Sequence, residues 1–227
     1  MRPTLPYIIG RSAISPYALN DHDFLTCAVK VQCTVNSLKF EIEGLPHSSQ
    51  DTETISCAET TLWAIMEYFS LKYPEYKSIL PSKLNSILTN ISSERLVPTK
   101  GLAIDQISFA LKEFGFGTKI YSRDVYKEDF LNLLSCYIES GIPLIIALET
   151  PERITHYIGH AILCTGHVQI EDYMIDALND TFIKNQELKR IINNKNIKLL
   201  DYDDIKKQFI FMDDNCPAYQ KAFLNKP

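Results

Sequence analysis

The pattern that most constrains the fold is a helix signal between residues 56 and 73. Apolar side chains recur there with the spacing of one helix face, and Pro74 ends the run. This stripe consists of Leu62, Ile65, Met66, Phe69 and Tyr73. Directly before it, Ser56-Cys-Ala-Glu59 matches a capping box, in which the side chains of Ser56 and Glu59 each accept a hydrogen bond from the other's backbone N–H. The capping box places Cys57 at the first helical position.

This position suits Cys57 to nucleophilic chemistry. A thiol attacks as its thiolate, and the unpaired N–H groups and macrodipole at a helix N-terminus stabilise a negative charge. The other cysteines have no such setting; they are Cys27, Cys33, Cys136, Cys164 and Cys216. Their scattered spacing, without a Cys-x-x-Cys pair, argues against a disulfide scaffold or a structural zinc site. We therefore expect free thiols in a reducing compartment.

A nucleophilic cysteine needs a base, and the base needs an orienting group. His160 opens an apolar run and is expected at the mouth of a buried strand, facing a cleft. Gln50 precedes Cys57 by seven residues, and its amide could join the Cys57 N–H in binding an oxyanion. Three side chains follow the last predicted strand, and any of them could hold the second imidazole nitrogen: Asp213, Asp214 and Asn215.

The other periodic segments predict both helices and strands. A hairpin is expected near the N-terminus, because the alternating runs 24–35 and 38–42 flank Asn36-Ser37. Helices are predicted over 82–89, 102–114 and 128–140, and a weak helix among loops over 178–207. Strands are predicted over 118–122, 143–148, 160–165, 168–176 and 209–212. The continuous apolar run 143–148 is typical of a strand buried on both faces. Segregated helices and strands favour an α+β fold.

Composition excludes several functional classes. With 45% hydrophobic and 22% charged residues in 227, the chain has an ordinary globular mix. A net charge of −5 without a basic block argues against nucleic-acid binding. The apolar runs are too short to span a bilayer, and residues 1–10 do not resemble a signal peptide. We expect a cytoplasmic protein without membrane attachment, with export as an effector as the alternative.

Three segments together resemble papain-like cysteine peptidases, in the branch that includes the bacterial double-glycine leader peptidases. The family's order of site residues, Gln–Cys–His–Asp/Asn, is found across these segments. The first is Gln50 to Trp63, the second is Gly-His-Ala-Ile-Leu-Cys-Thr-Gly-His at 159–167, and the third is Phe-Ile-Phe-Met-Asp-Asp-Asn-Cys-Pro at 209–217. The resemblance covers roughly residues 48–217, without an attached transporter. It implies a bacterial papain-like domain over 46–227, with the nucleophile helix packed against an antiparallel sheet. Residues 1–45 would form a hairpin extension, and 178–207 a polar insertion.

The resemblance also implies roles for site residues. Cys57 would be the nucleophile, His160 the base, Asp213 the orienting acid and Gln50 the oxyanion donor, with Asp214 and Asn215 as alternates for Asp213. Two features depart from the family pattern. The family places its glutamine six residues before the cysteine, where Asp51 stands here, and it often has a glycine after the cysteine, where Ala58 stands.

The expected activity is hydrolysis of a peptide or amide bond through a covalent thioester, with a peptide or protein as partner. The same triad could deamidate a glutamine or transfer the acyl group to an amine. A catalytically inactive papain-like binding or scaffold protein is the alternative from another class. His156, His160 and His167 do not form a metal site in this interpretation, because Gly159 interrupts any helical stripe, and no cofactor is expected. The sequence does not predict an oligomeric state.

Overall fold

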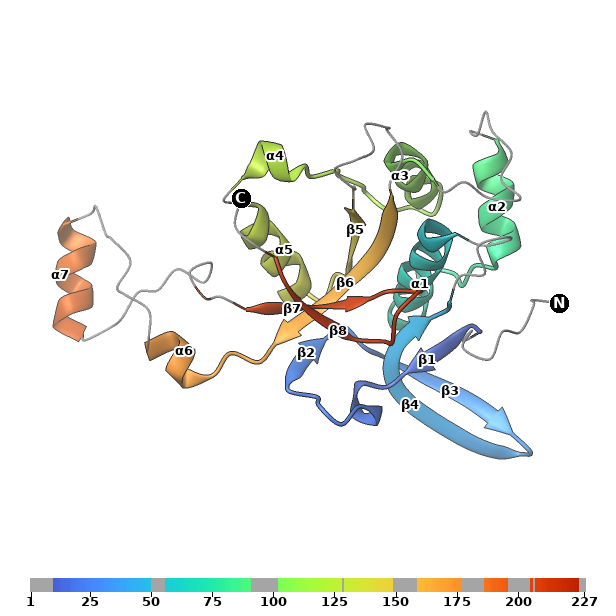
Figure 1. Ribbon diagram of the computed structural model, residues 1–227, viewed down its shortest axis with the longest axis horizontal. Coiled ribbons are helices and arrows are strands. Elements are labelled where there is room, and N and C mark those ends of the chain that lie inside the picture. Colours follow the sequence, from blue (N-terminus) through green and yellow to red (C-terminus); the bar gives the residue numbers. More distant parts are fainter. Residues whose placement is uncertain are drawn as a thin grey trace.

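The fold is organised around one long strand, β6 (His160–Val168), which has neighbours on both edges. One edge pairs with β5 (Leu144–Leu148) and, further along, with β2 (Phe24–Thr26). The other edge pairs with β7 (Gln208–Met212), which in turn pairs with β8 (Gln220–Phe223). All of these pairings are antiparallel (Figure 1).

The computed structural model describes residues 10–49, 56–90, 102–127, 129–148, 159–176, 186–195, 205 and 207–224.

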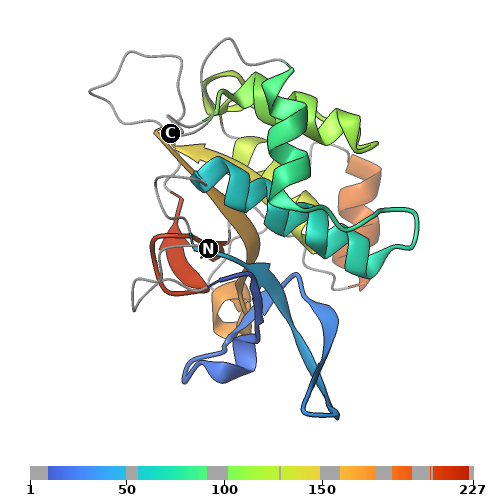
Figure 2. The same cartoon turned by 90° about the vertical axis from the view of Figure 1, so that its right-hand side faces the viewer.

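A second antiparallel sheet comes from the N-terminal part of the chain, in the order β1 (Ser12–Ile14), β4 (Leu38–His47), β3 (Val29–Val35). The predicted hairpin is confirmed for β3 and β4, but its first run, 24–35, is divided, because residues 24–26 form β2 and pair with β6 in the other sheet. Asn36 and Ser37 form its two-residue turn with φ of 49° and 66°, the left-handed conformations that a type I′ turn needs. Figure 2 shows this hairpin extending away from the helices.

Helices cover the sheets. The predicted capped helix is α1 (Cys57–Lys72), which lies against β6, β4 and β3. Helices α2 (Pro81–Thr89) and α3 (Ile104–Glu113) pack on one another beside α1, and α5 (Asp129–Glu139) packs on β5 and β6. The remaining helical elements are a 3₁₀ turn at Pro16–Ala18, α4 (Arg123–Tyr126), α6 (Asp172–Asp176) and α7 (Gln186–Lys195). In the part of the chain that the structure describes, none of these helices combines the length and apolar composition required to cross a membrane.

The largest hydrophobic core lies between α1 and the two sheets. Trp63 and Tyr68 of α1 contribute to it, with Leu163 of β6 and Ile210 of β7. Phe24, Val29 and Leu45, from the expected N-terminal extension, belong to the same core. Burial of each such side chain contributes roughly 1.5–3 kcal/mol. Residues 24–45 therefore stabilise the same structural unit as α1 and β6.

The prediction of two strands around Gly166 is wrong. Residues 160–168 form the single strand β6, and residues 172–176 form the helix α6. Gly166 is required for close approach and not for a turn: a Cβ there would lie 1.9 Å from the carbonyl oxygen of Leu25 in β2. The β6–β7 register also shifts between Cys164 and Gly166, which marks an irregularity inside a continuous strand.

Two other strand predictions need correction. Residues 118–122 form no strand, and Ile120 is 45% exposed, since no described strand pairs with this segment. Strand β5 is half-buried along Leu144–Ala147 and exposed at Leu148, so the prediction of a strand buried on both faces is wrong. The short helix α4 and the strand β8 were not predicted. Within 178–207, the predicted weak helix corresponds to α7.

Candidate active site

The N-terminus of α1 fixes the position of Cys57. Ser56 is the N-cap, and its Oγ accepts a hydrogen bond from the Glu59 N–H at 3.4 Å. In return, Glu59 Oε2 accepts from the Ser56 N–H at 2.6 Å. Both residues are buried, and Cys57 is half-buried at the first helical position. The predicted capping box is thus confirmed, and it holds the thiol at the positive end of the helix dipole.

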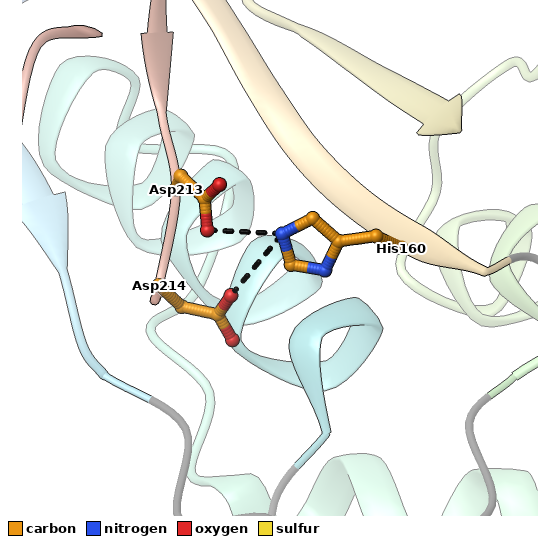
Figure 3. A group of neighbouring side chains, drawn as sticks. All are labelled: His160, Asp213 and Asp214. Atoms are coloured by element: carbon orange, nitrogen blue, oxygen red, sulfur yellow. Dashed lines mark hydrogen bonds and ion pairs between the residues drawn. The ribbon is translucent and has the colours of Figure 1, made fainter. Parts of the chain in front are cut away.

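His160 lies at the beginning of β6 and makes contacts on both sides of its ring. Its Nε2 lies 2.9 Å from Asp213 Oδ1, at the end of β7 (Figure 3). The Cys57 side chain lies next to the same ring, near enough to affect its protonation through hydrogen bonding. Since Asp213 occupies Nε2, Nδ1 is the ring nitrogen left for the thiol. The structure therefore brings together Cys57, His160 and Asp213, from α1, β6 and the residue that follows β7.

These contacts favour the imidazolium form of His160. The hydrogen bond with Cys57 raises the pKa of His160 to about 9, against the effect of burial, and Asp213 raises it further through its hydrogen bond and its charge. A cationic imidazole beside a thiol at a helix N-terminus stabilises the thiolate. The arrangement is therefore suited to a thiolate–imidazolium pair.

The three acidic and amide candidates after β7 have different environments. Asp213 Oδ1 accepts hydrogen bonds from His160 and from the backbone N–H of Asn215 at 2.9 Å, so one carboxylate both closes a turn and contacts the imidazole. Asn215 is exposed. Asp214 is buried, with Oδ1 at 3.9 Å from His160 Nε2 and Oδ2 at 2.8 Å from Thr60 Oγ1. Burial raises the pKa of Asp214 to about 6.

His160, Asp213 and Asp214 also form the group of described residues that could hold a metal ion, with one donor atom each and all within 4.8 Å. Binding of a metal to His160 Nε2 would replace the hydrogen bond to Asp213, so the two states exclude one another. Of the other histidines considered, His156 lies outside the described residues. His167 lies near the far end of β6, where its ring nitrogens contact Glu139 and the Val168 carbonyl.

Sequence reasoning missed His47 and Thr60, which adjoin the site. His47 ends β4 and is 4% exposed; burial lowers its pKa, and the charge of Asp213 acts against this. Both residues line a small cavity of about 10 Å³ that also contacts Asp214. Thr60 carries a sequence signal, since it is a hydroxyl three residues after Cys57 in the capped turn. Gln50, the predicted oxyanion donor, lies outside the described residues.

Comparison with known proteins adds no assignment: no protein-family model, no curated protein and no solved structure matches this chain. The chemistry of the site must therefore be argued from its own geometry.

Proposed function

We propose that this protein is a papain-like cysteine hydrolase that cleaves a peptide or amide bond. The observation that supports it best is the juxtaposition of three residues: the thiol of Cys57 at a capped helix N-terminus, His160 beside it, and Asp213 bonded to the His160 ring at 2.9 Å. Each of these residues has a role in nucleophilic catalysis by a thiolate. A peptide or protein is the corresponding substrate.

In the acylation step, the thiol proton is held on His160, and the Cys57 sulfur forms a C–S bond to the substrate carbonyl carbon. The carbonyl electron pair moves onto oxygen. The backbone N–H of Cys57, at the first position of α1, needs no partner within the helix and is available to the oxyanion. When the tetrahedral intermediate collapses, the C–N bond breaks and His160 gives its proton to the leaving amine.

In the deacylation step, His160 takes a proton from water, and the resulting hydroxide attacks the thioester carbonyl. The C–S bond then breaks, which releases the carboxylic acid and restores the thiolate. Asp213 accepts the Nε2–H hydrogen bond throughout, so it keeps the ring orientation and the tautomer that leave Nδ1 facing Cys57.

A peptide-library assay tests the proposal directly. The wild-type protein, Cys57→Ala and His160→Ala are each incubated with a proteome-derived peptide library, and the products are identified by mass spectrometry. We expect new peptide termini with the wild type only. Both variants should stay folded by circular dichroism, because each removes a half-buried side chain outside the main core.

The products also separate related activities. Conversion of glutamine to glutamate without new termini would identify a deamidase, and an acyl group on an added amine would identify an acyltransferase. If the wild type and Cys57→Ala give the same products, the enzymatic proposal is wrong, and a binding or scaffold protein becomes the better hypothesis.

A further inference from the structure

Two adjacent aspartates at the end of β7 contact two different elements of the site. Asp213 binds His160 of β6, whereas Asp214 Oδ2 accepts a hydrogen bond from Thr60 Oγ1 of α1 at 2.8 Å. The second bond joins residues 154 positions apart in the sequence, and both partners are buried. The two residues after β7 are thus hydrogen-bonded to two different elements, Asp213 to His160 of β6 and Asp214 to Thr60 of α1.

Thr60 lies in the same helical turn as the nucleophile. Its Oγ1 is 2.8 Å from the Cys57 carbonyl oxygen, and Thr61 Oγ1 lies 2.7 Å from the same oxygen. The single proton of the Thr60 hydroxyl bonds one acceptor at a time, so the lasting connection to Cys57 is the helical backbone, in which the Thr60 N–H donates to the Ser56 carbonyl oxygen at 3.0 Å. Any movement of Thr60 is therefore coupled to the first turn of α1, which contains Cys57. The Asp214–Thr60 bond connects this turn to the residue next to Asp213.

Burial of the ionised Asp214 carboxylate at this position lowers the stability of the folded state. Its side chain is 5% exposed, and in the described part of the molecule Oδ1 has no hydrogen-bond partner; the nearest cationic group is His160 Nε2 at 3.9 Å. Burial of a charged group without full pairing is unfavourable, and an apolar side chain would fill the space at lower cost. The hydrogen bond from Thr60, in the same turn as Cys57, would explain why an aspartate and not an apolar residue occupies this position.

We propose that Asp214 is a positioning residue, which acts through Thr60 to fix the Cys57 turn of α1 against the His160–Asp213 pair. The inference rests on the proposed function of Cys57 and deepens it. Asp213 orients the base, and Asp214 sets the separation between the base and the nucleophile. Because a thiolate–imidazolium pair depends on short contact, loss of this link should weaken the pair while all three of its members remain present.

The test is the pH dependence of Cys57 alkylation by iodoacetamide, mapped by mass spectrometry in the full chain. The wild type should react at Cys57 well below pH 8. In Thr60→Val and Asp214→Ala, the alkylation midpoint should rise by about one pH unit, so that the rate at pH 6 falls about tenfold. Thr60→Ser restores the hydroxyl and should restore the wild-type profile, which a role in packing alone would not predict.

Thr165→Val is the matched control, because it removes a fully buried threonine hydroxyl that bonds Thr26 and lies away from the site. It should lower stability without moving the Cys57 profile. If the wild type reacts below pH 8 and Thr60→Val behaves identically, the positioning role is wrong and the proposed function stands. If wild-type Cys57 is no more reactive than the other thiols, both proposals fail. Should Asp214→Ala not fold, the Thr60→Val and Thr60→Ser pair decides the matter.

Discussion

At the scale of single residues, His160 and Asp214 titrate differently although their charged atoms lie 3.9 Å apart. The pKa of His160 rises to about 9 mainly through its hydrogen bond with Cys57, whereas the pKa of Asp214 rises to about 6 through burial. Near pH 7, the imidazole is therefore protonated and the Asp214 carboxyl is largely ionised. Each shift has a consequence that can be measured.

The first prediction concerns the origin of the His160 shift. Removal of the thiol in Cys57→Ala deletes the largest cause, so the pKa of His160 should fall from about 9 toward its ordinary value of 6.5. Nuclear magnetic resonance of the imidazole carbons over pH 5 to 10 measures this directly. The change should be smaller in Cys216→Ala, which removes an exposed thiol near Asp213. An unchanged His160 titration in Cys57→Ala would contradict the thiolate–imidazolium pair.

The second prediction concerns the stability cost of Asp214. The unfolded carboxyl titrates near 3.8 and the folded one near 6, so the folded state binds more protons between these values. Wild-type stability should therefore fall as pH rises through this window and stay lower above it. Asp214→Asn keeps an acceptor for Thr60 and has no charge to bury, so it should exceed the wild type by about 1–3 kcal/mol at pH 7.5.

Urea unfolding at pH 4 and pH 7.5 measures the difference for Asp214→Asn. Its stability advantage should be largely lost at pH 4, because the wild-type carboxyl is then protonated in the folded state. Asp105→Asn, at an exposed aspartate of α3, serves as the control and should not reproduce this pH dependence. An equal stability advantage at both pH values would show that packing, and not charge, causes the stability difference between Asp214→Asn and the wild type.

At the scale of elements, local patterns predicted the structure where neighbours in sequence are also neighbours in space. The capping box and apolar stripe determine α1, and Asn36-Ser37 with its flanking alternation determines the β3–β4 hairpin. Prediction failed at Gly166, because the reason for that glycine is the backbone of β2, about 140 residues earlier. A glycine that permits close approach cannot be distinguished by sequence alone from one that permits a turn.

The third prediction follows from Gly166. Gly166→Ala would place a Cβ at 1.9 Å from the Leu25 carbonyl oxygen and 2.7 Å from the Thr26 Cα, both backbone atoms that cannot rotate away. We expect β2 to separate from β6 and stability to fall by roughly 3 kcal/mol or more. Thermal unfolding measures the loss. Gly117→Ala, where a Cβ meets nothing within 4 Å, is the matched control and should be nearly neutral.

At the scale of the whole molecule, the segments on either side of the predicted boundary at residue 45 contribute side chains to the same hydrophobic core. Strand β2 pairs with β6, and Phe24, Val29 and Leu45 pack with Trp63 of α1. The candidate site likewise depends on contacts between segments that are distant in the sequence. Residue types and order were sufficient to infer Cys57 and His160, and they left Asp213 as one of three candidates. The link from Asp214 to Thr60 could not be inferred, since it exists only once α1 and β7 have packed.

The fourth prediction tests this shared core. A chain that begins at residue 46 lacks β2, β3 and most of β4, so Trp63 and Leu163 would lose partners in the main core. We expect it to lack a cooperative thermal transition and to show no selective alkylation of Cys57. Circular dichroism with the iodoacetamide assay measures both. A cooperative transition like that of the full chain would show that residues 46–227 fold independently.

The order of α1 and β7 along the chain has a consequence for synthesis. Cys57 emerges from the ribosome early, but Asp213 and Asp214 follow it by more than 150 residues. Until β7 pairs with β6, the imidazole lacks its carboxylate and α1 lacks its anchor. Contacts between such distant segments form late in folding. A nascent chain that has exposed α1 but not β7 therefore lacks the contacts of Asp213 with His160 and of Asp214 with Thr60. Under the proposed function, the site is complete only once β7 has been synthesised and has paired with β6.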